Sequence, residues 1–317
     1  MAQNKTATSK STPAEVGGNM YYNNDTIIYF NGAFVKAADA KMDLYSQSLH
    51  YGYAVFEGIR SYKTASGDTR IFKAEAHFER LQKSAEAVNL PFLWATEELI
   101  DATYQVLSKN NLADAYIRPI IYAPANMSFV QNTESFIAIE AWEMQPFLGE
   151  KLLRVMSSSF QRPNPKGFNI TAKVSGHYIN SILASQEAKA NGFDEALLSD
   201  INGFIAEAPG ANVFYEKDGK LFTPSLGNIL PGITRATVLE ICRELSIPVE
   251  EKQISPEEIL KADTGFFCGT AAEIIGFASL DNVEFPKRWE DSVSFIIKQA
   301  YSAKVLESKF LPEEINA

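Results

Sequence analysis

The sequence contains few of the residues from which many catalytic sites are built. It has only two cysteines, Cys242 and Cys268, and three histidines, His50, His77 and His177. These numbers argue against a disulfide framework and predict that the protein has no metal site. The GxGxxG, Walker A, HExxH and G-x-S-x-G motifs are also absent. The usual signatures of dinucleotide-binding proteins, P-loop NTPases, metalloproteases and α/β-hydrolases are therefore missing.

Long apolar runs and an excess of basic charge are missing as well. No run approaches the ~20 apolar residues that a membrane span requires. Lys and Arg number 29 against 39 Asp and Glu, and no basic stripe suited to nucleic acid is present. Any anion site must therefore be built locally from a few Arg residues and backbone N–H groups. Residues 1–20 lack the apolar core of a signal peptide, so we expect a disordered tail and a cytoplasmic protein.

Apolar residues are abundant enough for a large core. They make up 46% of the 317 residues, and the chain is longer than the ~250–300 residues at which a single core stops growing. We therefore predict two domains, a small one at residues 21–144 and a large one at 152–317, joined by a linker at 145–151.

Turn residues and hydrophobic periodicity predict an α+β protein with mixed and antiparallel sheets. Three dipeptides between apolar segments predict hairpins: Asn31-Gly32, Asn202-Gly203 and Asp218-Gly219. Thr96 is expected to cap one helix, and Ser255 with Pro256 and Glu258 predicts the start of another. Further helices are expected at 75–90, 177–191 and 294–306, and further strands at 115–122, 135–142 and 152–157.

Two segments have the composition of ligand-binding turns. In LPGITR (230–235), Pro-Gly interrupts the chain and Thr234 is suited to cap the helix that follows. Free N–H groups at such a helix start bind phosphate well. In FCGTAAE (267–273), small residues after a short apolar strand let a ligand approach the backbone closely. Taken alone, an ordinary capped helix and an ordinary tight turn are the commoner explanations.

A third segment, ITAKVSGHY (170–178), contains a lysine in unusual surroundings. We expect Lys173 to lie within an apolar, strand-like stretch, ahead of Tyr178 at a helix start. Burial of such a lysine lowers the pKa of its amine and makes it available as a nucleophile. The alternative is a surface lysine on an edge strand, which is the commoner fate of lysines. Periodicity alone does not separate Lys173 from the other lysines.

Seven short motifs occur in order along the chain. They are YGYAVFEGIR (51–60), HFERL (77–81), AYIRP (115–119), AKVSGHY (172–178), EAPGANVF (207–214), LPGITR (230–235) and CGTAAEI (268–274). Together they resemble the class IV (fold type IV) aminotransferases and, within them, the branched-chain amino acid aminotransferases. The resemblance covers about residues 25–310.

This resemblance implies the cofactor pyridoxal 5'-phosphate and a role for each matching residue. Lys173 would be the Schiff-base lysine and proton shuttle, Glu207 would pair with the pyridine nitrogen, and Tyr178 would bond the phenolic oxygen. The phosphate would be held by Arg80, Ile233, Thr234 and Thr270. Gly269 and Ala271 would form the turn near the substrate carboxylate. The substrate side would be lined by Tyr51, Phe56, Gly58, Arg60, Tyr116 and Arg118.

The implied roles agree with the chemistry of amino acids. Their α-proton is too weakly acidic to remove unaided, so the cofactor acts as an electron sink with a protonated ring nitrogen. The Glu207 carboxylate would favour that protonated form. Each residue also has a plainer explanation: Glu207 on a surface turn, Arg80 in a surface ion pair, and Phe56 and Tyr116 as core aromatics.

The resemblance further implies substrates and a partner subunit. The substrates would be L-leucine, L-isoleucine and L-valine with glutamate and 2-oxoglutarate, and Arg118 would receive the side-chain carboxylate of glutamate. Tyr51 would reach the site of a neighbouring subunit in a homodimer or larger homo-oligomer. The loop Ala123–Phe129 differs from the Gly- and Val-rich loop usual in the family. A D-amino acid or (R)-amine transaminase of the same fold is therefore the alternative, and a non-catalytic cofactor-binding protein is a third hypothesis.

Overall fold

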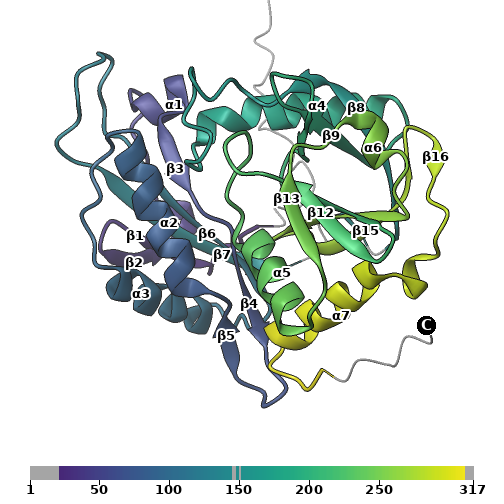
Figure 1. The fold of residues 1–317 in the computed structure, drawn as a ribbon. Helices are drawn as coiled ribbons and strands as arrows, with labels where there is room; N and C mark the ends of the chain where they lie inside the picture. The colour runs from purple at the N-terminus through teal and green to yellow at the C-terminus, as the bar shows by residue number, and fades with distance from the viewer. Residues whose placement is uncertain (1–20, 145–147, 150, 311–317) are drawn as a thin grey trace, which may run out of the picture.

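The computed structural model describes residues 21–144, 148–149 and 151–310, which form two β-sheets with helices packed against them (Figure 1). This arrangement agrees with the predicted α+β class. Most of the predicted linker, at 145–147 and 150, and the predicted tail at 1–20 lie outside the described residues.

The first sheet occupies the N-terminal half and is antiparallel throughout. Its strand order is β2-β1-β7-β6-β4-β5, and β3 pairs with β6. The Asn31-Gly32 turn joins β1 to β2, as predicted, because both residues adopt the positive φ that such a turn requires. The strands are β1 Ile27–Phe30, β2 Ala33–Lys36, β3 Ala54–Phe56, β4 Ile59–Lys63, β5 Thr69–Ile71, β6 Ala115–Tyr122 and β7 Phe136–Glu143.

Within residues 21–144, three α-helices accompany this sheet: α1 (Gln47–Tyr51), α2 (Ala74–Ala87) and α3 (Thr96–Lys109). Helices α2 and α3 bury Phe78, Leu81 and Leu99 in one core with the sheet residues Ile59 and Ile117. The apolar residues of α2 recur at helical spacing, so one face of the helix packs into the core. The other faces of α2 are available for polar contacts.

The second sheet has nine strands in the order β10-β9-β8-β15-β14-β11-β12-β13, with β16 paired to β15. It is mixed, because β12–β13, β15–β8 and β8–β9 are parallel pairs. The strands are β8 Leu153–Gln161, β9 Glu195–Ser199, β10 Ile205–Glu207, β11 Asn212–Lys217, β12 Lys220–Pro224, β13 Val249–Lys252, β14 Thr264–Gly269, β15 Glu273–Leu280 and β16 Val283–Glu284.

Four α-helices belong to the described part of the second half: α4 (Tyr178–Ala190), α5 (Ile233–Glu244), α6 (Pro256–Ile259) and α7 (Val293–Val305). Helices α5 and α7 share a core with Phe214 and Phe266 of the sheet. Tyr62 and Phe72 from the first half enter the same core, so apolar packing joins the two halves.

A close backbone contact also joins the halves. Gly52 ends α1 with φ +66°, and its carbonyl oxygen accepts a hydrogen bond from Gly176 N at 3.0 Å. A Cβ atom placed on Gly52 would lie 2.6 Å from Gly176 Cα. Gly52 must therefore lack a side chain for the segments to approach this closely, and a Cβ on Gly176 would be tight, at 3.2 Å from Gly52 O.

Most predicted elements are confirmed within about two residues, but some local predictions are wrong. Thr96 is the first helical residue of α3, and the cap position is Ala95, whose side chain cannot accept a hydrogen bond. Lys173 does not lie in a strand: its segment is irregular, and only Val174 forms an isolated bridge, to Val55. Ser255 does cap α6, by accepting a hydrogen bond from Glu258 N.

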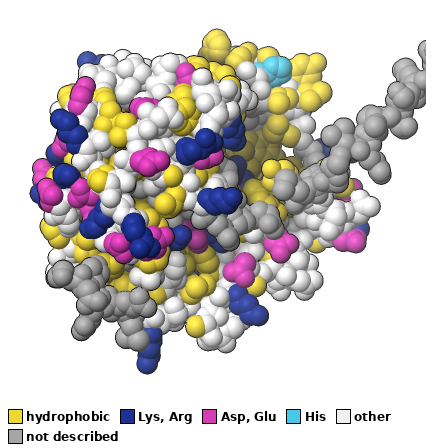
Figure 2. Space-filling model, turned by 90° about the vertical axis from the view of Figure 1, so that its right-hand side faces the viewer, with side chains coloured by type: hydrophobic (Ala, Val, Ile, Leu, Met, Phe, Trp, Pro, Cys, Tyr) yellow, Lys and Arg dark blue, Asp and Glu magenta, His cyan; other side chains and the backbone are white. Residues whose placement is uncertain are grey.

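The surface carries both charged and apolar regions. Figure 2 shows hydrophobic side chains gathered toward the upper edge of one face, with Lys, Arg, Asp and Glu spread over the rest. Large exposed apolar residues lie on α1, on the loop after β6 and on α4: Leu49, Tyr51, Phe129, Val130, Ile179 and Ile182. Among the described residues, no helix is long and apolar enough to cross a membrane.

Candidate active site

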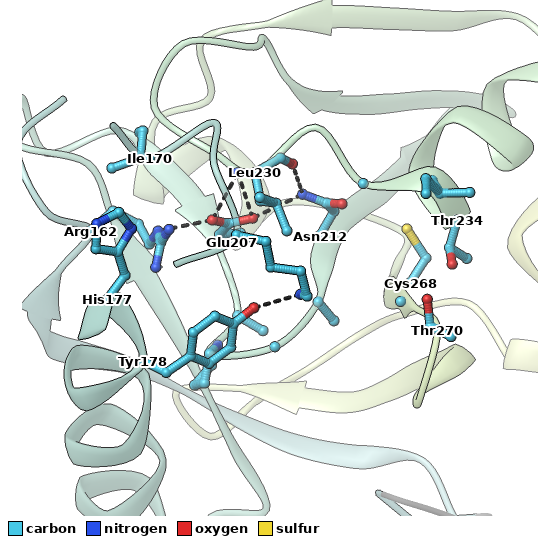
Figure 3. Close-up of a pocket in the computed structure, with 18 of the residues that line it drawn as sticks. Arg162, Ile170, His177, Tyr178, Glu207, Asn212, Leu230, Thr234, Cys268 and Thr270 are labelled. Atoms are coloured by element: carbon cyan, nitrogen blue, oxygen red, sulfur yellow. Dashed lines mark hydrogen bonds and ion pairs between the residues drawn. The ribbon is translucent and has the colours of Figure 1, made fainter. Parts of the chain in front are cut away.

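One cavity contains all the residues that were predicted to hold a cofactor. It lies between α2 and the second sheet, and Figure 3 shows most of its lining. The predicted residues in its lining are Arg80, Lys173, Tyr178, Glu207, Ile233, Thr234, Gly269 and Thr270. The lining also includes Arg162 and Asn212, which were not predicted.

Lys173 is held by both its backbone and its side chain. Its N–H donates to Ser84 Oγ at 3.0 Å, and its carbonyl oxygen accepts from Phe56 N at 3.1 Å. These bonds to two different elements explain why the segment is not a strand. The Nζ atom donates to Tyr178 Oη at 2.6 Å and lies 5.1 Å from the centres of the Phe56 and Tyr178 rings. The surface alternative for Lys173 is therefore wrong.

Glu207 is a buried carboxylate at the end of β10. Its Oε1 pairs with Arg162 Nε at 2.8 Å, and its Oε2 accepts from Asn212 Nδ2 at 2.9 Å. Leu230 N also donates to the carboxylate, at 3.1 Å. Burial raises the pKa of Glu207, and the charge of Arg162 and the Leu230 N–H partly offset this rise. A surface turn is excluded, since Glu207 is 4% exposed.

The first turn of α5 borders the cavity at the expected anion site. The helix begins at Ile233 after Gly232, which is extended and offers no side-chain cap. Thr234 is thus the second helical residue, and the prediction that it caps the helix is wrong. The helix starts two residues earlier than a Thr234 cap would require. As in any α-helix, the first N–H groups of α5 have no intrahelical partners. Such groups, together with the helix dipole, favour an anion.

Arg80 reaches this end of the cavity from α2 and forms a buried ion pair. Its Nε and Nη2 donate to Glu57 at 2.7 and 2.9 Å, and its Nη1 donates to Pro231 O at 3.0 Å. His77 Nδ1 lies 2.8 Å from the same carboxylate. The prediction left open a surface ion pair for Arg80, and burial excludes it, since only 12% of the Arg80 side chain is exposed.

The Glu57 cluster has a definite charge state. Burial alone would raise the pKa of Glu57, but the charge of Arg80 and hydrogen bonds from His77 and Arg80 hold it well below its usual range. Burial lowers the pKa of His77, so its ring is neutral near pH 7 and donates to Glu57 through Nδ1. The cluster is therefore one carboxylate, one guanidinium and one neutral imidazole.

Phe56, Tyr116 and Arg118 form a second group beside Lys173. The Arg118 guanidinium carbon lies 4.6 Å from the centre of the Phe56 ring, and its Nη2 donates to Tyr116 Oη at 3.1 Å. The Phe56 ring is 4.9 Å from that of Tyr178. A Cβ on Gly58 would lie 2.0 Å from Tyr116 Oη. These predicted substrate residues are thus together, and Gly58 makes room for the tyrosine.

Arg60 and Ala271 lie farther along the same side. Arg60 Nη1 pairs with Glu273 at 2.7 Å, and the Tyr62 hydroxyl donates to the same oxygen at 2.8 Å. Glu273 has φ +51° and ends the turn that contains Ala271. Arg60 therefore anchors this turn through Glu273, a contact that the sequence did not indicate.

Tyr51 is not part of the Lys173 cavity. It is 48% exposed and lines a separate cavity with Phe129, whose ring centre lies 5.6 Å away. His177 borders both cavities. Within one chain, Tyr51 is therefore not brought to Lys173.

The arrangement combines an amine, an anion-binding helix start and a buried carboxylate around one cavity. Cys242 and Cys268 are free thiols whose pKa values burial raises, so they are poor nucleophiles at neutral pH. The described part of the chain contains no cluster of side chains suited to a metal ion. The chemistry of the site therefore centres on Lys173.

Comparisons with known proteins agree with this geometry. The family model described as "Amino-transferase class IV" matches residues 54–280. The chain is similar to the branched-chain-amino-acid aminotransferase of Escherichia coli K12, with 38% identity over 284 residues, covering 86% of this chain and 91% of that protein.

Two solved structures are also similar. The branched-chain aminotransferase of Thermoproteus uzoniensis with norvaline has a TM-score of 0.86 and 35% identity, covering 90% of this chain and 96% of that one. The branched-chain amino acid aminotransferase of Thermobaculum terrenum in its PLP-form (holo-form) has a TM-score of 0.83 and 32% identity, covering 90% of this chain and 96% of that one.

Proposed function

The chain belongs to the class IV aminotransferases, and from this we propose that it is a pyridoxal-phosphate-dependent branched-chain amino acid aminotransferase. It transfers the amino group of L-leucine, L-isoleucine or L-valine to 2-oxoglutarate. The observation that carries this proposal is the position of Lys173 Nζ beside Tyr178 Oη in a cavity that also holds Glu207 and the start of α5.

The residues of the cavity fit pyridoxal 5'-phosphate. The first turn of α5, with Ile233 and Thr234, suits the phosphate, and Thr270 lines the same end. A carboxylate has about four acceptor positions. Asn212 Nδ2 and Leu230 N donate to Glu207, and Arg162 pairs with it electrostatically. The carboxylate therefore keeps acceptor capacity for a protonated ring nitrogen. Gly269, beside the cavity, lets the backbone approach closely.

When bound, pyridoxal phosphate supplies an electron sink for the electrons released with the α-proton of the amino acid. Side chains of the protein bind and transfer the protons of the reaction. Glu207 holds a proton at the ring nitrogen, because a buried anion favours a cation beside it. Lys173 Nζ would accept the α-proton of the amino acid and act as the proton shuttle. Tyr178 Oη, 2.6 Å from Nζ, orients the amine.

The group beside Lys173 accounts for two kinds of substrate side chain. Phe56 and Tyr178 present apolar ring surface to a branched aliphatic chain. Arg118, stacked on Phe56, offers donors to the side-chain carboxylate of glutamate. The turn at Ala271, anchored by Arg60 through Glu273, offers backbone N–H groups to the α-carboxylate that all substrates share.

Assembly, location and domain boundaries are part of the proposal. We propose a homodimer or larger homo-oligomer, supported by the exposed apolar residues of α1 and α4 and by Tyr51, which lies outside the Lys173 cavity. A cytoplasmic location is supported by the two free thiols. The domain boundaries 21–144 and 152–317 are supported by the division into two sheets.

A panel of half-reactions tests the function. Purified protein loaded with pyridoxal phosphate should absorb visible light, and L-leucine, L-isoleucine, L-valine or L-glutamate should convert that absorbance to the spectrum of the aminated cofactor. Lys173→Ala should bind the cofactor without this conversion. Conversion by D-alanine or (R)-phenylethylamine, and not by L-amino acids, would instead support the D-amino acid or (R)-amine alternative that the unusual Ala123–Phe129 loop suggests.

A further inference from the structure

Helix α2 carries three polar side chains toward the site: His77, Arg80 and Ser84. They are three and four positions apart and therefore lie on one face of the helix. His77 is 2% exposed and Ser84 1% exposed. Buried polar groups cost free energy unless each finds a partner, so the partners of this face indicate what it does.

The partner of Ser84 is the backbone of Lys173. The 3.0 Å bond from Lys173 N to Ser84 Oγ and the 3.1 Å bond from Phe56 N to Lys173 O are the backbone hydrogen bonds of this residue in the described structure. Because Lys173 belongs to neither a helix nor a strand, no regular ladder fixes its position. Ser84 and Phe56 do so instead, and both come from the N-terminal half of the chain.

The partner of Arg80 is Glu57, which is 0% exposed. Arginine has five N–H donors. Two bond to the Glu57 carboxylate and one to Pro231 O. His77 fixes the carboxylate in turn. The plane of the guanidinium is therefore set by a buried anion, and two donors remain for a ligand at the start of α5.

We propose that Ser84 and Glu57 are positioning residues, through which helix α2 sets the spacing between the Lys173 amine and the Arg80 guanidinium. This inference rests on the proposed function, in which the amine and the phosphate site hold opposite ends of one rigid cofactor. A rigid ligand held at both ends requires a fixed separation between its two anchors. One helix that contacts both anchors provides it.

Two small molecules test the Lys173 end and the Arg80 end of the cofactor site separately in the full-length apoenzyme. Pyridoxal, which lacks the phosphate, reports on Lys173 through the rate at which visible absorbance develops. Inorganic phosphate reports on the Arg80 end through the rise in melting temperature that it causes. We expect Ser84→Ala to slow the pyridoxal reaction about tenfold, since a small misplacement of a reacting group is costly, and to leave the phosphate effect unchanged.

Glu57→Gln should give the opposite pattern. A glutamine at this position can accept from Arg80 through only one oxygen, so the guanidinium loses its fixed plane. We expect inorganic phosphate to bind roughly tenfold more weakly, a loss of the size seen when outer partners of a ligand-binding group are removed. The rate with pyridoxal should stay within about threefold of the wild-type rate, because the contacts of Lys173 are intact.

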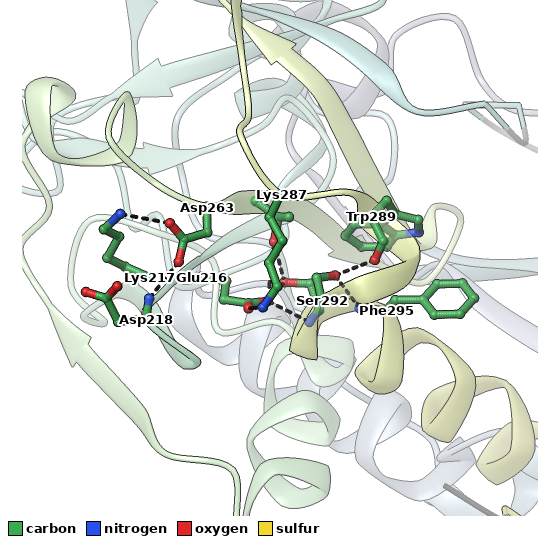
Figure 4. Close-up of polar contacts among 10 residues, drawn as sticks. Glu216, Lys217, Asp218, Asp263, Lys287, Trp289, Ser292 and Phe295 are labelled. Carbon is green, nitrogen blue, oxygen red and sulfur yellow. Dashed lines mark hydrogen bonds and ion pairs between the residues drawn. The ribbon is translucent and has the colours of Figure 1, made fainter. Parts of the chain in front are cut away.

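Matched controls separate positioning from stability. Ser181 is 4% exposed, and its hydroxyl has no hydrogen-bond partner in the described structure, so Ser181→Ala should alter neither probe. Glu216 is a second carboxylate with 0% exposure, and it pairs with Lys287 at 2.8 Å (Figure 4). It also accepts a hydrogen bond from Ser294 N at 3.0 Å. Glu216→Gln should lower the melting temperature as Glu57→Gln does, yet keep both probe responses.

Three results would overturn the proposal. The first is a parallel loss of both responses in each variant, and the second is a Ser84→Ala rate equal to that of Ser181→Ala. The third is tighter phosphate binding in Glu57→Gln, which the loss of a negative charge would cause without any effect on orientation. If wild-type protein develops no visible absorbance with pyridoxal phosphate, the proposed function itself fails. If that absorbance develops, but Ser84→Ala does not selectively slow the pyridoxal reaction and Glu57→Gln does not selectively weaken phosphate binding, only the positioning proposal fails.

Discussion

The Tyr178 hydroxyl accepts a hydrogen bond from Lys173 Nζ at 2.6 Å, across the short 3-10 helix Ser175–His177 that precedes α4. Tyr178→Phe removes this hydroxyl and keeps the ring that packs on Phe56. Because the amine then loses its nearest polar partner, we expect kcat with L-leucine to fall about tenfold. Steady-state kinetics at saturating pyridoxal phosphate measure this kcat. Tyr104→Phe, at a partly exposed tyrosine of α3, is the control, and equal kcat in the two variants would contradict the role of Tyr178.

Gly58 has no room for a side chain. A Cβ atom would lie 2.0 Å from Tyr116 Oη, so Gly58→Ala must displace the tyrosine that bonds to Arg118. We expect the KM values for L-leucine and L-glutamate to rise and the free energy of unfolding to fall by ~1–3 kcal/mol, as for other overpacked sites. Kinetics and urea unfolding measure the two effects. Gly167→Ala, where the nearest atom is 3.7 Å away, should leave both unchanged.

Arg118 should distinguish glutamate from leucine. Its guanidinium stacks on Phe56 and donates to Tyr116, which leaves further donors for a carboxylate. In Arg118→Gln, we expect the KM for L-glutamate to rise about tenfold or more, the size of one lost charge-assisted contact. The KM for L-leucine should change less than about threefold, since leucine presents no second carboxylate. Arg154→Gln, at an exposed position, serves as the control. An equal rise for both substrates would show that Arg118 does not select glutamate.

The buried Glu57 should make the protein sensitive to acid. Its pKa in the folded protein lies well below its usual value, so the ionised carboxylate stabilises the fold above the unfolded-state pKa, which is about 4.3. That contribution is lost as the pH falls below this value toward the folded-state pKa. Glu57→Gln should be less stable by ~3–5 kcal/mol at pH 7, because a buried pair is broken.

The same variant should also respond less to acid. Between about pH 5 and pH 3, its free energy of unfolding should fall less steeply than that of the wild type, since the titrating group is gone. Urea unfolding at a series of pH values gives both curves. Parallel curves for the two proteins would mean that Glu57 does not titrate differently in the folded and unfolded chain.

Local features of the fold could be predicted because their causes are local. Asn31-Gly32 and Asp218-Gly219 adopt the positive φ angles that tight hairpins need, and this preference is visible in the dipeptide itself. The residues that cap helices were harder to predict. Thr96 and Thr234 both fall inside the first turn of a helix rather than before it, because the preceding chain, not the threonine, decides where the helix begins.

The site could be predicted only in part. The eight predicted cofactor residues that line the Lys173 cavity belong to motifs whose order along the chain is recognisable. Asn212 stands in the EAPGANVF motif and reaches Glu207 through the pairing of β10 with β11. Arg162 belongs to none of the motifs, so its pairing with Glu207 could not be predicted. Glu57 stands in the YGYAVFEGIR motif, yet a sequence does not show that a carboxylate is fully buried beside an arginine from α2.

The contact between Gly52 and Gly176 has a consequence for anyone who wishes to redesign this enzyme. The two residues belong to opposite halves of the chain, and a side chain on Gly52 would push the segment before Tyr178 away from α1. Random libraries that include Gly52 would therefore contain many members whose two halves no longer pack together, so this glycine is best kept fixed.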